Sequence, residues 1–574
     1  MTRAEDEVNE QPWQLRVAAK RERCQASIPA AWRLSEEFKK SIGASATAAT
    51  NLIELGAISR SGVLSAQELE ITETATASDL LRELRSGEVS AEAATVAFSK
   101  RAAVAGQLTS CLTETFFDQA LERAKFLDEY LEREKKPFGP FHGLPISIKD
   151  SFCVKGVDTT IGFVSFLDNG AATKNSALVQ ILLDLGAVLY CKTNIPQTMM
   201  KQEEDVIEYA DMKQTADSEN NIFGRTLNPH NTSLTAGGSS GGEGALVALR
   251  GSLLGVGTDI AGSIRIPSLC CGVYGFKPTA DRIPFGGQVS PALHGIPGIV
   301  PCAGPLATSF SDLELFFKAV LDANPADYDS GALSVPWIST PGSTLEDLRK
   351  RPMRIGVLSE DPVFPLHPPV KRAIADASAA LAKAGHEVIQ LPHDPATNAS
   401  KANGIAFQMF SIDPLDTSMK HIQKSGEPPI NSVKLGAPPG EKHIYTIDEL
   451  AGLNVQRHHF TDAWRRIWVE NKLDIVLSPG AQNTAVPHDT YRMPPYTLIW
   501  NFLDYPACII PYGKASKKLD PEPRLFEPHE GPSSDIPEIN HGAPRAVQIV
   551  APRFGDEKCL AAARIVDEIL NGTE

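Results

Sequence analysis

The chain has 574 residues, of which 42% are hydrophobic and 22% are charged, and its formal net charge at pH 7 is −15. This composition is sufficient for a large apolar core, and the length by itself suggests roughly three or four domains. The acidic balance argues against a nucleic-acid partner and against binding to anionic membranes.

The chain shows neither a targeting segment nor a metal-binding pattern. Residues 1–25 are charged throughout and lack the apolar core of a signal peptide. No window approaches the roughly 18 uninterrupted apolar residues that a membrane-spanning helix needs. The nine cysteines form no C-x-x-C pair, and the histidines show no metal-ligand spacing. We therefore expect a reduced cytoplasmic protein with no integral membrane span, no metal and no cofactor.

The first predicted elements are helical. Residues 1–76 are predicted as an N-terminal helical extension. Helical periodicity is clear over residues 75–106, with a Ser-Gly break at 86–87, and over the strongly amphipathic stretch 116–136.

Strands and helices then alternate along the chain. The segment PISIKDSF (145–152) predicts a strand whose polar face carries Lys149. Residues 175–194 predict a helix, a stop at Gly186 and a buried strand. This order favours an α/β fold.

A second β-α-β pattern follows later in the chain. Residues 353–358 and 386–391 are predicted strands, and the segment between them, near 369–385, is a predicted helix. Stretches rich in proline and glycine are predicted as surface loops, namely 334–342, 426–441 and 513–535.

The segment from Gly237 to Ser268 contains nine glycines and carries the chemistry. Its GGSSGG start, taken alone, is typical of a flexible loop. The later part predicts a short strand, a tight loop at 258–262 and a helix that begins near Ser263. Backbone N–H groups at a helix start are unpaired and can receive an oxyanion, so a serine there suits acyl transfer. A capping serine at an ordinary turn is the simpler interpretation of Ser263 alone.

The lysine of the first predicted strand offers a second clue. Lysines on polar strand faces are usually solvated, but Lys149 stands in an apolar context. Burial makes an ammonium group lose its proton more easily, so Lys149 could act as a base near neutral pH.

Residues 237–267 resemble the amidase signature family throughout, from GGSSGGEGA to GTDIAGSIRIP. The resemblance extends over roughly residues 77–570 and is nearest to fungal acetamidase-like and general amidases. Further matching segments are GLPISIKDSF (143–152), TNIPQTMM (193–200), NNIFGRTLNPHN (220–231), GVYGFKPT (272–279) and the region 541–560.

The resemblance implies a fold and a set of site residues. The implied fold is one α/β/α catalytic domain over residues 77–574, around a mixed, mostly parallel twisted sheet, which replaces the several domains suggested by length. Ser263 matches the nucleophile, Lys149 the base, and Ser239 the bridging serine behind a cis peptide bond after Gly238. The remaining implied positions are the oxyanion-hole N–H groups of Ile260, Ala261, Gly262 and Ser263, and the substrate contacts Met199, Gly237 and Gly238.

The implied activity is hydrolysis of the C–N bond of a small aliphatic or aryl carboxylic acid amide through an acyl-enzyme, without cofactor or metal. The acyl pocket is expected among residues 193–200, 404–422 and 496–511, which are apolar and aromatic. A homodimer is expected by analogy with the family. The segment 201–214 departs from the family pattern and is predicted to be a solvated insertion, with a lid over the pocket as the alternative.

Several other interpretations stay open. Within the family, these are an enzyme for longer acyl amides, resembling fatty acid amide hydrolase, and a glutaminase subunit of a tRNA-dependent transamidation complex. A Ser-His-Asp hydrolase would have to use His142, His230 or His294, but no G-x-S-x-G elbow surrounds Ser263. A non-catalytic scaffold with the inherited fold is the last alternative, although all three triad positions are filled.

Overall fold

The computed structural model describes residues 12–200, 216–293, 295, 298–435, 443–526 and 533–572. Its centre is an eleven-stranded sheet with the order β1-β3-β2-β6-β8-β7-β12-β13-β11-β9-β10. The strands are β1 (Leu112–Thr115), β2 (Pro145–Lys149), β3 (Val188–Thr193), β6 (Leu254–Asp259), β7 (Tyr274–Lys277), β8 (Cys302–Ala307), β9 (Arg354–Val357), β10 (Glu387–Gln390), β11 (Ile475–Pro479), β12 (Ala507–Lys514) and β13 (Pro544–Val550); β4 (Glu219–Asn220) and β5 (Gly224–Arg225) form a separate hairpin.

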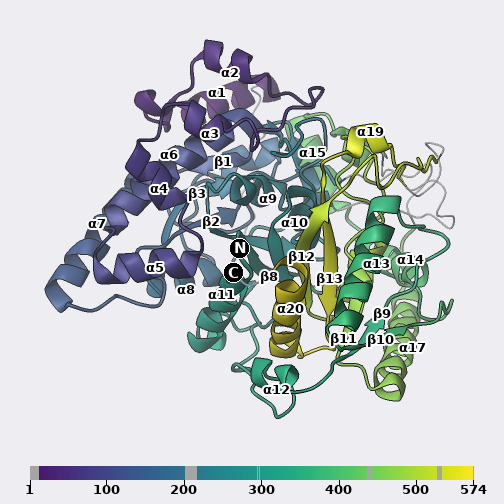
Figure 1. Ribbon diagram of the computed structural model, residues 1–574. Helices are drawn as coiled ribbons and strands as arrows, with labels where there is room; N and C mark the ends of the chain where they lie inside the picture. Colours follow the sequence, from purple (N-terminus) through teal and green to yellow (C-terminus); the bar gives the residue numbers. More distant parts are fainter. Residues whose placement is uncertain are drawn as a thin grey trace.

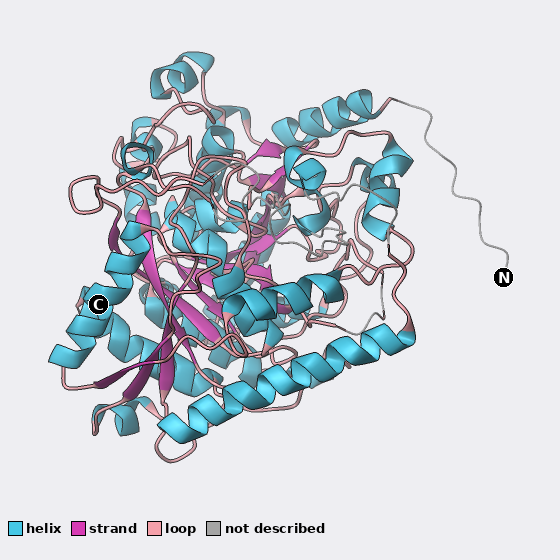
Figure 2. Cartoon of the chain, turned by 90° about the vertical axis from the view of Figure 1, so that its right-hand side faces the viewer, coloured by secondary structure: helices cyan, strands magenta, loops and turns pink. Residues whose placement is uncertain are grey.

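Helices lie on both sides of these strands (Figures 1 and 2). The predicted mixed α/β architecture is therefore confirmed. The helices are α1 (Trp13–Ala26), α2 (Glu36–Ile42), α3 (Ala57–Arg60), α4 (Ala66–Thr72), α5 (Ala77–Ser86), α6 (Ala91–Thr109), α7 (Phe117–Glu134), α8 (Ala177–Asp184), α9 (Gly241–Ala248), α10 (Arg265–Cys271), α11 (Phe310–Asp322), α12 (Leu345–Arg349), α13 (Pro368–Lys383), α14 (Ala399–Phe410), α15 (Thr417–Ser425), α16 (Asn431–Leu435), α17 (Ile447–Asn471), α18 (Pro495–Phe502), α19 (Pro537–Asn540) and α20 (Asp556–Asn571).

The sheet is mixed, with two groups of parallel strands separated by antiparallel strands. Strands β3, β2 and β6 run parallel to one another, and so do β11, β9 and β10. The other neighbouring pairs of the described sheet are antiparallel. The share of parallel pairs is thus smaller than predicted, because a buried strand has the same apolar pattern whichever way its neighbour runs.

Local capping residues explain why the predicted helices begin and end where they do. The Thr76 side chain accepts a hydrogen bond from the Asp79 N–H at the start of α5, and Gly87 ends that helix with a φ of 77°. Ser90 caps α6 in the same way as Thr76 caps α5. The predicted break at 86–87 is confirmed.

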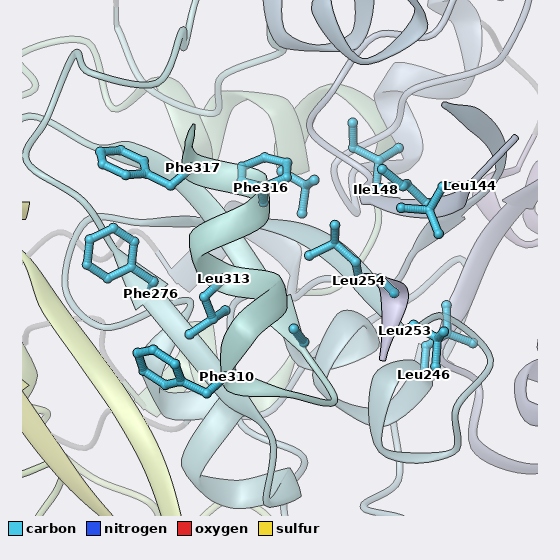
Figure 3. Packing of buried hydrophobic residues seen from close by; sticks show 14 of the residues in the cluster. Leu144, Ile148, Leu246, Leu253, Leu254, Phe276, Phe310, Leu313, Phe316 and Phe317 are labelled. Carbon is cyan, nitrogen blue, oxygen red and sulfur yellow. The ribbon is translucent and has the colours of Figure 1, made fainter. Parts of the chain in front are cut away.

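The apolar core lies between the sheet and its helices. Figure 3 shows side chains of α9, α11, β2, β6 and β7 gathered in this core, among them Leu246, Phe316, Ile148, Leu254 and Phe276, all buried. Burial of this much apolar surface is the main force that holds the strands of the site in register.

The N-terminal part of the chain is helical and is bound to the rest through charged side chains. Helix α1 inserts Arg16, which donates to the Val164 carbonyl over 2.9 Å. Lys20 of the same helix is 2% exposed and forms an ion pair with Glu114 over 2.6 Å. The division of the chain at residues 76 and 77 stays a prediction, and the segment 201–214 lies outside the described residues.

Candidate active site

Three segments that are far apart in the sequence meet beside the parallel strands. Strand β2 ends at Lys149, and β6, its parallel neighbour, ends at Asp259. Ser239 stands just before helix α9, and Ser263 stands in the turn between β6 and α10. The fold therefore brings together the three residues that the resemblance indicated.

Within the described residues, the hydrogen-bond partners of the Lys149 amine are hydroxyl groups. Its side chain is completely buried, and its Nζ donates to Ser239 Oγ over 2.6 Å and to Thr258 Oγ1 over 2.7 Å. Burial lowers the pKa of Lys149 to about 7, although the charges of Asp259 and Glu243 oppose this shift. A large fraction of Lys149 is therefore neutral near pH 7 and able to accept a proton.

The two serines lie on adjoining backbone segments. The peptide bond between Gly238 and Ser239 is cis, as predicted. The Ser240 N–H donates to the Ser263 carbonyl over 3.1 Å, which holds the two segments together. Ser239 is 3% exposed and Ser263 is 7% exposed. Between the two serine hydroxyls we find no direct hydrogen bond; such contacts often tighten only when substrate is bound.

The turn before Ser263 needs a glycine. Gly262 has a φ of 131°, and a Cβ there would lie 2.3 Å from Thr497 Oγ1. The Gly262 N–H donates to Asp259 Oδ1 over 2.8 Å. This contact differs from the prediction of four N–H donors in an oxyanion hole, since in this conformation the Gly262 N–H has a protein acceptor. For the N–H groups of Ile260, Ala261 and Ser263 no acceptor is found within the described residues.

A buried ion pair stabilises the turn before Ser263. Asp259 and Arg265 are both fully buried and lie 3.0 Å apart. Asp259 also accepts from the Ile264 N–H over 3.1 Å. Burial opposes ionisation of Asp259, but Arg265 holds its pKa at about 2, so the carboxylate stays charged. Arg265 in turn donates to the Thr497 carbonyl and to Gln548 Oε1, both over 2.9 Å, and thereby fixes α18 and β13 against the turn.

Glu243 is a further buried acid near Lys149 that the sequence did not single out. It accepts from Ser147 Oγ over 2.6 Å and from Thr193 Oγ1 over 2.9 Å. Burial raises its pKa to about 8, against the effect of these hydrogen bonds and of Lys149. Glu243 therefore links α9 to β2 and β3 through buried hydrogen bonds.

The GGSSGG segment is ordered and buried, which corrects the interpretation as a flexible loop. Gly241 begins helix α9, and residues 237–242 are all buried. A Cβ on Gly242 would lie 2.3 Å from the Asn194 backbone nitrogen, so the glycine allows α9 to pack directly on the end of β3. Of the predicted substrate contacts here, Gly237 accepts from Ser218 Oγ over 3.0 Å, and Gly238 precedes the cis bond.

Two apolar clusters include residues of the predicted site. Met199 packs against a cluster of Ile161, Phe163, Ile195 and Ile422. Ile260 and Ala261 pack against a second cluster formed largely by α14, α17 and α18, with Ile405, Met409, Tyr496, Ile499 and Trp500 among its members. The three segments that were expected to form the acyl pocket thus all contribute to these two clusters.

The histidines proposed for a Ser-His-Asp site are engaged elsewhere. His142 Nδ1 accepts from the Phe138 N–H over 3.0 Å, and His230 Nε2 lies 3.0 Å from the Cys271 carbonyl. Burial lowers the pKa of both. No histidine is hydrogen-bonded to Ser263 within the described part of the chain, and His294 lies outside it.

The described residues offer neither a metal site nor a membrane-spanning helix. Over the residues that the structure describes, no group of three or more His, Cys, Asp or Glu side chains is placed to hold a metal ion. The helices described are all too short or too polar to cross a membrane.

Comparison with known proteins gives consistent results. A family model described as Amidase matches residues 93–560. An amidase of Gibberella moniliformis is 40% identical over 97% of this chain and 99% of its own length, and an acetamidase of Emericella nidulans is 36% identical over 98% of each. Among solved structures, a fatty acid amide hydrolase superposes with a TM-score of 0.84 at 30% identity, over 99% of this chain and 96% of that one.

Proposed function

Because the chain belongs to the amidase family and is an amide hydrolase, we propose that it cleaves the C–N bond of carboxylic acid amides through Lys149, Ser239 and Ser263. The observation that carries this proposal is the fully buried Lys149 amine, 2.6 Å from Ser239 and with a pKa of about 7. An amine of this kind can take a proton from a serine hydroxyl at neutral pH.

The proposed reaction has two halves. In the first, neutral Lys149 accepts the Ser239 proton, Ser239 accepts the Ser263 proton, and Ser263 Oγ attacks the amide carbon. The oxyanion is received by the free backbone N–H groups of Ile260, Ala261 and Ser263. The proton returns through Ser239 to the leaving nitrogen as the C–N bond breaks. In the second half, water attacks the acyl-enzyme and releases the acid.

Small aliphatic or aryl amides are the proposed substrates. The two apolar clusters beside Met199 and Ile260 suit an apolar acyl group. Similarity to an acetamidase over 98% of the chain supports the smallest acyl groups. The structural likeness to a fatty acid amide hydrolase, at a TM-score of 0.84, favours longer acyl chains as the second candidate.

Covalent labelling tests the proposed nucleophile. A fluorophosphonate is expected to add to the wild-type protein at Ser263, as located by peptide mass spectrometry, and to leave the Ser263→Ala protein unlabelled. Labelling of both proteins at the same site would contradict the assignment. Measurement of kcat/KM for acetamide, hexanamide, benzamide and a C18 amide then separates the two substrate classes, since the enzyme should prefer the acyl size that its pocket holds.

Three sequence-based predictions are kept as proposals. Residues 1–76 form an extension to a catalytic domain of residues 77–574, the protein acts in the cytoplasm, and it forms a homodimer. Sedimentation of the full chain would test the last of these.

A further inference from the structure

A carboxylate outside the triad is buried without a cationic partner. Glu427 is 4% exposed and forms no ion pair with any described residue. It accepts four hydrogen bonds from neutral donors: the Val164 N–H at 2.7 Å, Gln197 Nε2 and Asn221 Nδ2 at 2.8 Å each, and Ser425 Oγ at 3.2 Å. Burial raises its pKa. A buried carboxylate is costly, so a site that saturates it with donors from separate segments points to a specific role for the group.

The turn held by Glu427 has an unusual backbone. Gln197 begins the 3-10 turn η3 (Gln197–Met200) and is fully buried, and its Oε1 accepts from the Ile430 N–H over 3.0 Å. The next residues, Thr198 and Met199, have positive φ values of 66° and 51°. Residues other than glycine adopt this left-handed backbone conformation only where the surroundings hold them, and a β-branched residue such as threonine is poorly suited to it. Gln197 is therefore the fixed end of a strained turn.

The Glu427 carboxylate is also connected to other elements around Met199, namely α15 and η2. Met419 and Ile422 of helix α15 belong to the apolar cluster that contains Met199. The ring of His421 lies 4.7 Å, between centroids, from that of Phe166 in η2 (Val164–Asn169). Glu427 lies two residues after the end of α15 and accepts a hydrogen bond from the N–H of Val164, the first residue of η2. One side chain thus ties η2, η3 and the end of α15 around a single apolar surface.

This surface adjoins the reaction centre through strand β3. Thr193, the last residue of β3, pairs in register with Lys149 and donates to Glu243. The Asn194 carbonyl accepts from the Gly242 N–H of α9 over 3.0 Å. The strained turn begins three residues further on, so its position is set by the strand at one end and by Glu427 at the other.

We propose that Glu427 is a positioning residue that holds the Gln197–Met199 turn and helix α15 together as one wall of the acyl site, and so determines which acyl groups the enzyme accepts. This rests on the proposed function, in which Met199 contacts the substrate. A large acyl group would contact the whole of this wall, whereas an acetyl group would contact only a small part of it.

The test is a selectivity ratio measured on the full chain. In Glu427→Gln, an NH2 group replaces one carboxylate oxygen. It cannot accept hydrogen bonds from the donors around it, so we expect the turn to loosen. We expect the ratio of kcat/KM for hexanamide to that for acetamide, and the corresponding benzamide ratio, to fall about tenfold, mainly through KM. Gln197→Leu removes the same contact from the other side and is expected to shift the ratio in the same direction, which keeps the test decisive if one variant folds poorly.

An exchange variant and a matched control separate positioning from general stability. The double change Glu427→Gln with Gln197→Glu reverses the donor and acceptor of one hydrogen bond and should recover part of the ratio. Asp128 is a useful control, since its carboxylate accepts from the Ala91 and Glu92 N–H groups over 2.7 and 2.9 Å, between α6 and α7. Asp128→Asn should lower thermal stability without changing the ratio.

The possible failures are distinguishable. A wild-type protein that hydrolyses none of the amides would contradict the proposed function itself. An active wild type whose ratio is unchanged in both Glu427→Gln and Gln197→Leu, or is changed equally by Asp128→Asn, would overturn the role of Glu427 alone.

Discussion

Two lysines on neighbouring parallel strands are both completely buried, yet their surroundings differ. Lys149 ends β2 and contacts the hydroxyls of Ser239 and Thr258. Lys192 of β3 lies in register with Ile148, next to Lys149, and forms an ion pair with Asp150 over 3.0 Å. It also donates to the Asp158 carbonyl over 2.9 Å.

The difference shows how partners decide the role of a buried amine. Lys192 has a carboxylate to compensate its charge, so its ammonium can serve as a fixed structural cation. Lys149 has no ion-pair partner within the described chain, and burial therefore lowers its pKa to about 7. The region around Lys149 is expected to govern catalysis, whereas the region around Lys192 is expected to govern stability.

The largest expected effect comes from loss of the nucleophile that Lys149 activates. Ser263→Ala removes the nucleophile, and kcat should fall by at least about 10⁴-fold. Both lysine environments stay intact in this variant, so the thermal unfolding transition should change little. Amide hydrolysis is measured on acetamide, with unfolding followed by circular dichroism. Near wild-type turnover by folded Ser263→Ala would contradict the proposed nucleophile.

The next effect tests the contrast between the lysines directly. Lys149→Met removes the base, and kcat/KM should fall about 10²- to 10⁴-fold. Its free energy of unfolding should change less than that of Lys192→Met, because Lys149 has no carboxylate that would be left unpaired. Denaturant titration and acetamide kinetics on the same preparations provide both values.

Lys192→Met is the matched variant on the neighbouring strand. It leaves Asp150 buried without its cation, which should cost about 3–5 kcal/mol of stability. At temperatures where the variant remains folded, its pH–rate profile should keep the shape of the wild type. A variant that is stable but inactive would place Lys192, too, among the reacting groups.

A smaller loss is expected from the residue between base and nucleophile. In Ser239→Ala the amine of Lys149 loses one hydroxyl partner, and the proton path to Ser263 is interrupted. We expect kcat to fall about 10²-fold, less than for Ser263→Ala, because the nucleophile and the backbone donors remain. If the loss is negligible, the proton travels by another route.

The smallest effect is a pH dependence. The pKa of Lys149 is lowered from 10.5 to about 7, so the neutral amine becomes scarce below pH 7. At substrate concentrations well below KM, kcat/KM should fall about tenfold per pH unit there. Between pH 7 and 10.5 the unfolded chain binds the proton that the folded chain lacks, so stability should rise with pH in this window. Lys149→Met should remove that rise, and a flat wild-type rate profile below pH 7 would exclude this base.

Sequence patterns were sufficient for much of the local structure. Helical periodicity and the Ser-Gly break at 86–87 predicted α5, α6 and α7, and alternation predicted β2 with Lys149 on it. These signals come from residues within a few positions of one another. The triad positions came from a long motif and its resemblance to a family. Without that resemblance, Ser263 is most simply interpreted as a capping residue, since the reactivity of a hydroxyl at a helix start depends on neighbours that the local sequence does not show.

Only the tertiary structure decided which groups surround those residues. Arg265 meets Gln548 across 283 positions, and Gln197 meets Glu427 across 230. No local pattern marks such pairs, because each forms only when strands and helices from distant parts of the chain pack on one another. For the same reason, the sequence identified Lys149 only as a candidate base. Its pKa depends on the fold, which buries Lys149 beside hydroxyl groups and places the Asp150 carboxylate next to Lys192 instead.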